Sequence, residues 1–200
     1  WIVLLIASYL FYASWRADFA LLMMASTLVD YWTGRKMGSI PNKAGRKKYL
    51  YFSLFINLGL LFAFKYLGFI NESVRDILHF FGTEYPVERF DILLPLGISF
   101  YTFQTLSYSI DVYRGDKEPE KHLGIFACYI SFFPQLVAGP IETSRKFLPQ
   151  FHEKHSVDWQ RIIEGLKLIV WGLFKKIVIA DNLAIFVETV YGNPEMYSGN

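Results

Sequence analysis

Apolar runs alternate with short charged connections along this chain. The runs cover residues 1–14, 19–31, 49–70, 94–113, 123–141 and 163–180. A helix needs about 20 apolar residues to cross a bilayer. The first two runs are shorter than that, and only four residues join them, which predicts a tight helical hairpin. Asp181 or Asn182 is expected to cap a final helix after the last run. The pattern predicts an all-α, polytopic integral membrane protein with about five to seven transmembrane or re-entrant helices.

The run 123–141 differs from the others because polar and helix-breaking residues interrupt it. They are Pro134, Gln135, Gly139 and Pro140. Proline removes a backbone donor, and interrupted backbone at membrane depth is tolerated where it lines a cavity or is buried in protein. A broken or re-entrant helix fits this run better than a plain span. Periodicity alone does not decide between spanning and re-entry.

The charges of the connections predict an orientation in the membrane. Residues 34–48 carry six basic and no acidic side chains, so the positive-inside rule places them in the cytoplasm. Residues 71–91 carry five acidic and two basic side chains and are expected outside. Within them, Ser73 is a candidate cap for a short interfacial helix. Residues 114–122 form a charged cytoplasmic turn, and no linker divides the chain, so residues 1–200 are expected to form part of one domain.

Composition narrows the classes of function. Hydrophobic residues make up 53% of the chain and aromatic residues 18%, above the usual soluble balance. The net charge of +2, with no basic face of interleaved aromatics, excludes a nucleic-acid partner. Cys128 is the single cysteine, which excludes a disulfide within the chain. His152 and His155 could lie on one side of a helix, but without a third ligand we predict no metal site.

A polar stripe follows the run 94–113. Tyr101, Gln104, Tyr108 and Asp111 recur at spacings of three and four, so on a helix they lie along one side. Polar side chains inside a membrane bind neighbouring helices or mark substrate pathways. Gln104 is therefore either an interhelical hydrogen-bonding residue or part of a channel. Asp111 either pairs with Arg114 on the same helix face or serves that channel.

Other charged residues in apolar surroundings have two interpretations. Asp30 is close enough in sequence to Arg35 and Lys36 to be offset by them. Lys175 and Lys176 interrupt the run 163–180, where adjacent ammonium groups are costly unless they snorkel to headgroups or meet an anionic partner. That partner is either an acidic side chain or an anionic donor molecule at the cytoplasmic end.

Three segments resemble the signatures of one family. They are LPLGISFYTFQTLSYSIDVY at 94–113, SFFPQLVAGPIETSRKFLPQF at 131–151 and GLFKKIVIADNLA at 172–184. Their order and sequence resemble the membrane-bound O-acyltransferases, in particular the bacterial branch of alginate and peptidoglycan O-acetylases. The earlier segments ASYLFYASW and STLVDYWTGRKMG resemble that branch's first two helices. The resemblance therefore covers nearly the whole chain.

The resemblance implies that this chain is the N-terminal part of a longer transmembrane domain. The family's catalytic histidine is expected beyond residue 200, so these residues should be inactive alone and contain no catalytic residue. The channel candidates are Tyr101, Gln104, Tyr108, Asp111, Pro134, Gln135, Gly139 and Pro140. The donor-side candidates are Arg145, Lys175 and Lys176. Many relatives carry arginine at the position of Thr143, so Arg145 would have to supply that contact here.

The resemblance also implies an activity. An acyl group, most simply acetyl, passes from a cytoplasmic donor such as acetyl-CoA or another acyl carrier to hydroxyls of an extracytoplasmic polysaccharide such as alginate. The expected location is the bacterial inner membrane, with companion proteins of an acetylation complex and no tightly bound cofactor. The alternatives are D-alanyl transfer to teichoic acid, transport of a lipid-linked glycan, and a noncatalytic scaffold in exopolysaccharide export.

Overall fold

The computed structural model describes residues 1–88, 93–136, 139–140, 142–154 and 156–192, and it is all-helical over these residues. The chain divides into two compact units, Trp1–Glu153 and Lys154–Asn200, which are described separately below. The all-α class predicted from the apolar runs is confirmed.

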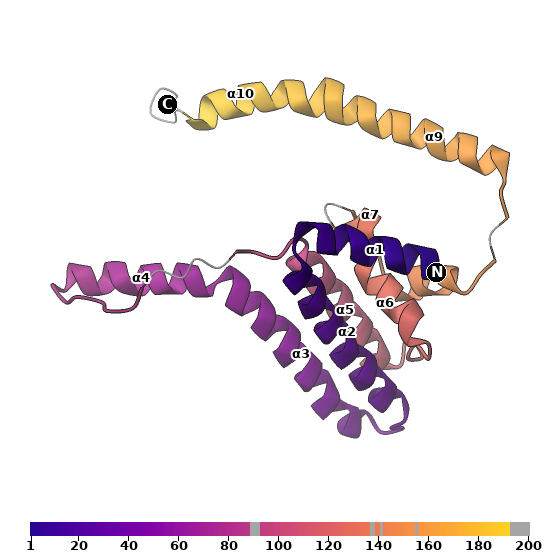
Figure 1. Ribbon diagram of the computed structural model, residues 1–200, viewed down its shortest axis with the longest axis horizontal. Helices are drawn as coiled ribbons and strands as arrows, with labels where there is room; N and C mark the ends of the chain where they lie inside the picture. Colours follow the sequence, from indigo (N-terminus) through magenta and orange to yellow (C-terminus); the bar gives the residue numbers. More distant parts are fainter. Residues whose placement is uncertain (89–92, 137–138, 141, 155, 193–200) are drawn as a thin grey trace. The chain divides into compact units, whose positions relative to one another are not determined.

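The first unit is built around a helical bundle (Figure 1). Its bundle helices are α1 (Ile2–Trp15), α2 (Ala17–Gly38), α3 (Lys43–Lys65), α5 (Ile98–Arg114) and α6 (Leu123–Ser131). Helices α2, α3 and α5 pack against one another pairwise, and α1 packs on α2 and α6. The tight α1–α2 hairpin is confirmed, because the extended backbone of Arg16 ends α1 and begins α2 directly.

The basic connection 34–48 is largely helical. Helix α2 continues to Gly38 and α3 begins at Lys43, so a short turn joins them. The side chain of Asn42 accepts a hydrogen bond from the backbone N–H of Ala44 at 3.0 Å. This cap satisfies a donor that the first turn of a helix otherwise leaves free, which is why α3 begins before the apolar run does.

The expected span 49–70 is bent. Helix α3 ends at Lys65, and α4 (Leu67–Phe80) follows at 54° to it. Within the described residues, no single helix has both the length and the hydropathy of a membrane span, whereas α3 and α4 meet that test as a bent pair. Ser73 is not a cap: it lies inside α4 and its hydroxyl donates to the carbonyl of Phe69 at 2.8 Å.

The break predicted in the run 123–141 is confirmed. Helix α6 ends at Ser131, Phe132 leaves the helical conformation with φ −55° and ψ 100°, and α7 (Phe133–Leu136) follows as a separate short helix. The backbone N–H of Phe133 donates to the hydroxyl of Ser8 at 3.2 Å, which attaches α7 to α1. Two further short helices follow, α8 (Ser144–Phe147) and η1 (Leu148–Phe151).

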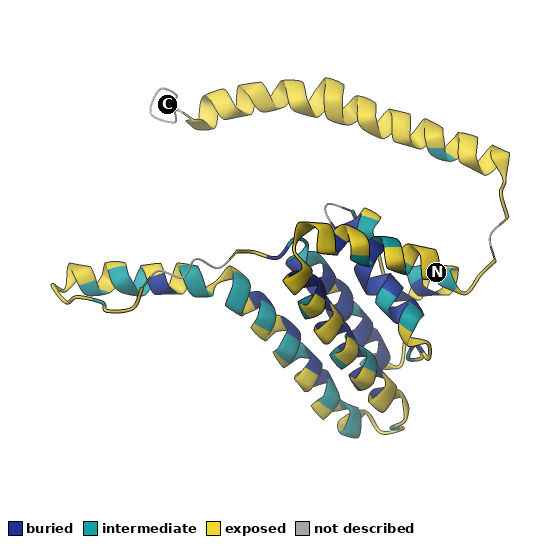
Figure 2. Ribbon diagram, in the orientation of Figure 1, coloured by how far each residue is buried: buried dark blue, intermediate teal, exposed yellow. Residues whose placement is uncertain are grey.

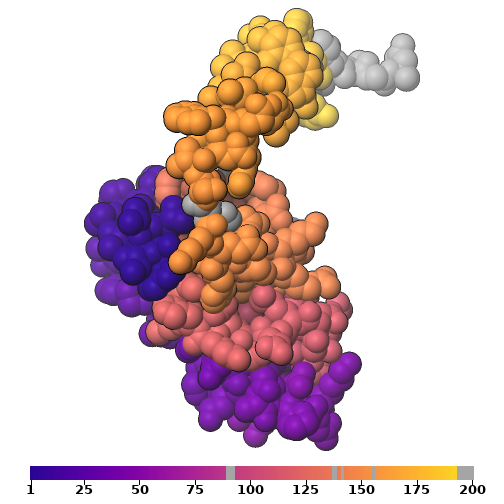
Figure 3. Space-filling view, turned by 90° about the vertical axis from the view of Figure 1, so that its right-hand side faces the viewer, coloured from indigo at the N-terminus to yellow at the C-terminus, as the bar shows by residue number. Residues whose placement is uncertain are grey.

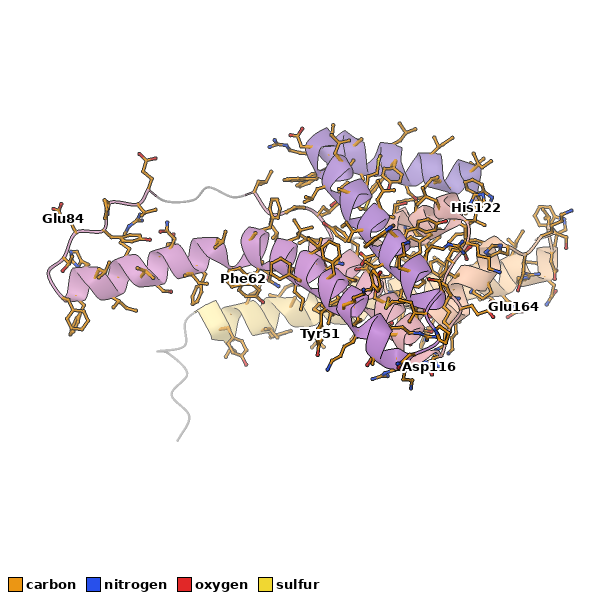
Figure 4. All side chains as sticks on the ribbon, turned by 90° about the horizontal axis from the view of Figure 1, so that it is seen from below. Tyr51, Phe62, Glu84, Asp116, His122 and Glu164 are labelled. Carbon is orange, nitrogen blue, oxygen red and sulfur yellow. The ribbon has the colours of Figure 1, made fainter. Side chains whose placement is uncertain are left out.

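Burial follows the inward sides of the bundle helices (Figure 2). Large apolar side chains of α1, α2, α5 and α6 form the centre of the core, among them Tyr12, Met23, Tyr108, Phe126 and Tyr129. Polar side chains are buried in the same bundle, so the core is held by hydrogen bonds as well as by packing. Tyr51 and Phe62 of α3, labelled in Figure 4, are exposed instead.

The second unit is a helix in three parts, drawn from orange to yellow in Figure 3. The parts are α9 (Trp159–Phe174), the π-helical turn η2 (Lys175–Ala180) and α10 (Asp181–Gly192). Asp158 caps α9 by accepting from the backbone N–H groups of Gln160 and Arg161. The expected cap at Asp181 or Asn182 is wrong. The helix continues through both residues, and the Asn182 carboxamide donates to preceding carbonyls instead.

Candidate functional site

The predicted polar stripe of α5 faces the inside of the bundle. Tyr101, Gln104, Tyr108 and Asp111 are all buried. The Nε2 of Gln104 donates to the backbone carbonyl of Tyr129 at 2.8 Å, and the Tyr129 hydroxyl donates back to the Gln104 carbonyl at 3.4 Å. Gln104 therefore holds α5 against α6, as the interhelical alternative predicted. A role in a channel stays a prediction.

Tyr108 joins α5 to the connection between α5 and α6. Its hydroxyl accepts a hydrogen bond from the backbone N–H of Glu120 at 3.0 Å. Gly34 of α2 packs directly on the phenol, because a Cβ at that position would lie 2.9 Å from the Tyr108 oxygen. The Tyr101 hydroxyl, about two helical turns before Tyr108 on α5, is buried without a hydrogen-bond partner in the described part of the chain.

Asp111 connects α5 to α8. Its Oδ2 accepts from the Ser144 hydroxyl at 3.0 Å and lies 3.7 Å from the Arg145 Nε. The expected pairing with Arg114 on the same helix is wrong, because α8 packs against α5 and supplies both partners. Arg145, a donor-side candidate, thereby lies next to the channel candidate Asp111. Its side chain is 56% exposed, so it retains access to solvent.

An acidic residue that sequence reasoning did not select lies between two segments. Glu120 belongs to the connection between Gly115 and His122; Figure 4 labels Asp116 and His122 in this region. Its Oε2 lies 3.0 Å from the Nε2 of His152, and its Oε1 accepts from the backbone N–H groups of Lys121 and His122 at 2.8 Å each. Glu120 therefore ties the residue that follows η1 to this connection.

The contacts of Glu120 predict a pH dependence of stability. Burial alone raises the pKa of this carboxyl, but hydrogen bonds from His152 and the backbone N–H groups of His122 and Lys121 outweigh it, and the pKa falls below its ordinary 4.5. A carboxyl with a lowered pKa in the folded state stabilises the fold above its unfolded pKa, and this stabilisation is lost as the pH falls through the folded value.

We therefore expect Glu120→Gln to lower the midpoint of thermal unfolding at pH 7. The difference from the unaltered protein should shrink as the pH falls from the ordinary carboxyl pKa of 4.5 through the lower pKa of the folded state, because the carboxyl is then protonated in both states. Circular dichroism of the detergent-solubilised protein across pH 3 to 8 measures this, with the exposed Glu164→Gln as a control. A difference that stays constant across this pH range would contradict the prediction.

Asp30 is the centre of a buried hydrogen-bond network. The sequence predicted other partners for this residue. The side chain is fully buried, and the Nδ2 of Asn57 donates to its Oδ1 at 2.9 Å and its Oδ2 at 2.8 Å. Ser53 also donates to Asp30, and its hydroxyl lies 3.0 Å from that of Ser109 on α5. The expected offset by Arg35 and Lys36 is wrong. An acidic residue within an apolar run was the available sequence signal.

The four candidates of the broken segment lie around one pocket of about 240 Å³. Its described lining is Phe132, Pro134, Gln135, Gly139, Pro140, Glu142 and Phe147. The backbone N–H of Gly139 donates to the Gln135 carbonyl at 2.9 Å, and the Gln135 side chain donates to the Pro140 carbonyl. A Cβ on Gly139 would lie 2.6 Å from the Gln135 Cα, so the close turn requires glycine.

The paired lysines lie in the second unit. Both belong to η2, where Lys176 pairs with Asp181 and the Lys175 Nζ lies 5.3 Å from the centroid of the Trp171 ring. The acidic side-chain partner considered for this pair is therefore present for Lys176. The predicted role of either lysine at the donor side stays a prediction. No metal site was predicted at His152 and His155. The described residues contain no group of three side chains that could bind a metal ion, and His155 lies outside those residues.

These observations define a helical protein whose bundle buries a polar stripe beside a broken helix. No family model matches the chain, and no solved structure matches it. Among curated proteins, the chain is 41% identical over 189 residues to the probable alginate O-acetylase AlgI of Pseudomonas aeruginosa, which covers 94% of this chain and 36% of that protein. It is 38% identical over 201 residues to the probable alginate O-acetylase AlgI of Azotobacter vinelandii, covering 100% of this chain and 40% of that protein.

A third relative has another substrate in its name. The chain is 32% identical over 216 residues to the peptidoglycan O-acetyltransferase of Helicobacter pylori, covering 94% of this chain and 39% of that protein. The chain thus spans about two fifths of the length of these relatives. The resemblance to the alginate and peptidoglycan O-acetylase branch is confirmed. Such relatives indicate a membrane-associated bacterial protein.

Proposed function

We propose that this chain is part of a membrane-bound O-acyltransferase that transfers an acyl group, most simply acetyl, to hydroxyls of a polysaccharide. The observation that carries the proposal is the 41% identity over 94% of the chain to a probable alginate O-acetylase. The peptidoglycan O-acetyltransferase relative supports the same reaction on a different glycan. The two names share the transfer of acetyl to a sugar polymer and differ in the acceptor.

The proposed reaction needs an acyl thioester as donor. A hydroxyl oxygen of the polysaccharide attacks the thioester carbonyl, a C–O bond forms, and the C–S bond breaks. The hydroxyl proton passes to a general base and then to the sulfur of the departing thiolate, so the products are an ester and a free thiol. A neutral histidine imidazole is suited to accept that proton. We place this histidine beyond residue 200, in the part of the relatives that this chain does not match.

Within this scheme the first unit supplies one wall of the reaction path. The buried stripe of α5 and the pocket at the broken segment bring polar groups to neighbouring parts of one bundle. Arg145 beside Asp111 supplies a cation next to that wall. We further propose a multi-pass location in the inner membrane, with the donor on the cytoplasmic side, the glycan outside, and companion proteins completing the acetylation complex. The bent α3–α4 pair supports a spanning segment by length and hydropathy.

The experiment that tests the proposal measures ester-linked acetate on surface and exported glycans. Bacterial cells would carry the complete gene, an empty vector, or the gene with the first downstream intramembrane histidine changed to alanine. We expect acetate with the complete gene and background levels in both controls. No change in acetate, with membrane expression verified by immunoblot, would contradict acetyl transfer. Ester-linked D-alanine in the same hydrolysates would then support D-alanyl transfer, and its absence would support transport or a scaffold.

A further inference from the structure

The pocket at the broken segment contains an acceptor oxygen without a donor. Gln135 is 8% exposed, and its Nε2 donates to the carbonyl of Pro140. Because a carbonyl can only accept, this contact fixes the nitrogen of the carboxamide on the Pro140 side and leaves Oε1 on the other. Within the described residues, Oε1 is buried and has no hydrogen-bond partner.

A buried carbonyl oxygen without a donor is rare and costs free energy, so its presence needs a physical reason. Four buried side-chain atoms in the described part of the chain share this state, and Gln135 lines a pocket. The backbone around it is held tightly, since the Gly139 N–H donates to the Gln135 carbonyl and Gly139 packs on the Gln135 Cα. The carboxamide is therefore anchored at its nitrogen while its oxygen remains available.

The other lining residues define the chemistry of the group that could supply the donor. The rings of Phe132 and Phe147 lie 5.1 Å apart at 72° and provide apolar contact surface. The charged residue among the described lining is Glu142, which is exposed, and neither lysine nor arginine is among them. An anion would meet a carboxylate without a compensating cation, whereas a neutral group with an N–H or O–H would satisfy Oε1.

We propose that Gln135 Oε1 is a binding group for a neutral hydrogen-bond donor on one of the two substrates, seated against Phe132 and Phe147. This inference rests on the proposed acyl transfer, which supplies two sources of such a donor. One is an amide N–H of a pantetheine arm that carries the acyl group. The other is a hydroxyl of the glycan. The volume of about 240 Å³ holds one such group rather than a whole substrate.

The test measures binding directly, so that it does not depend on catalysis. The complete protein in lipid nanodiscs would be titrated separately with S-acetyl-pantetheine and with cellotetraose, a neutral oligosaccharide, by isothermal titration calorimetry. Gln135→Leu removes both the donor and the acceptor of the carboxamide. Gln135→Glu keeps an acceptor oxygen but loses the N–H that holds Pro140. Gln160→Leu, at an exposed glutamine of α9, is the matched control.

We expect one of the two probes to bind the unaltered protein and to lose about fivefold to tenfold in affinity in Gln135→Leu. Gln160→Leu should stay within about twofold, and Gln135→Glu, which keeps an acceptor oxygen, should lose less affinity than Gln135→Leu. The responding probe identifies the donor arm or the glycan as the source. Equal losses in Gln135→Leu and Gln135→Glu would assign the residue a purely structural role through Pro140 and overturn the proposal.

Unchanged binding of both probes in Gln135→Leu, or no binding of either to the unaltered protein, would also overturn the proposal. Thermal unfolding of each variant shows whether a loss reflects misfolding. Failure here is distinct from failure of the proposed function. If acetate is transferred in cells but probe binding does not depend on Gln135, this inference alone is contradicted. Gln135-dependent binding without acetate transfer supports the pocket and removes the acetyl assignment.

Discussion

Changing Asp30 to alanine is expected to lower the free energy of unfolding of the first unit by about 2 to 4 kcal/mol. The reason is that Asn57 donates to both oxygens of Asp30, and Ser53 donates to Oδ1 as well. Without the carboxylate these buried donors lose that acceptor and keep only their other contacts, the Ser109 hydroxyl for Ser53 and the Ser53 carbonyl for Asn57. A buried donor left without its acceptor costs about 1 to 3 kcal/mol. The network also connects α2, α3 and α5, so its loss loosens the bundle that carries the candidate site.

Two variants make the Asp30 prediction specific. Asp30→Asn keeps one acceptor oxygen but places an NH₂ toward Asn57, so a smaller loss is expected. Asp18→Ala is the matched control, because Asp18 is 74% exposed and pairs with Arg16 at 3.0 Å. Exposed pairs of this kind contribute at most about 1 kcal/mol. Thermal and chemical unfolding in detergent measure the three variants, and equal stability of Asp30→Ala and Asp18→Ala would contradict the role of the network.

Changing Gly97 to alanine is expected to destabilise the junction between α5 and the broken segment. Gly97 has φ +70°, a conformation that costs a residue with a Cβ about 1 to 2 kcal/mol. A Cβ there would also lie 2.6 Å from the carbonyl oxygen of Leu136, at the end of α7. This neighbour is backbone and cannot rotate away. The residue before Gly97 is also fixed, because the Tyr12 hydroxyl of α1 donates to the Leu96 carbonyl at 2.7 Å.

The Gly97 prediction has a control of opposite sign. Gly59 lies within α3, and a Cβ there meets no atom within 4 Å. Gly59→Ala should be neutral or stabilising by up to about 1 kcal/mol, because alanine favours the helix. Melting midpoints of both variants and ester-linked acetate from the complete gene are the measurements. A Gly97→Ala protein as stable as Gly59→Ala would show that α5 and α7 do not approach as described.

Several features of the fold could be predicted from short stretches of the sequence. Breaks in the run 123–141 followed from its prolines and glycine, and the hairpin of α1 and α2 followed from two apolar runs with four residues between them. Capping made boundaries harder to predict. Asn42 starts α3 inside a basic stretch, whereas Asp181 and Asn182, both suitable caps, lie within a helix that continues. An N-cap residue acts only where a helix actually begins, which depends on the rest of the chain.

Sequence by itself determined the helical class, the polar stripe of α5, the broken segment and the resemblance to the acetylase branch, because apolar runs, spacing and motifs are local properties. Only the tertiary structure decided which groups the buried charges meet. Asp111 meets Ser144 and Arg145 of α8, and Asp30 meets Ser53 and Asn57 of α3, rather than the nearby basic residues. Such partners depend on which helices pack together and how each is rotated about its axis, which is set by the packing of the whole bundle.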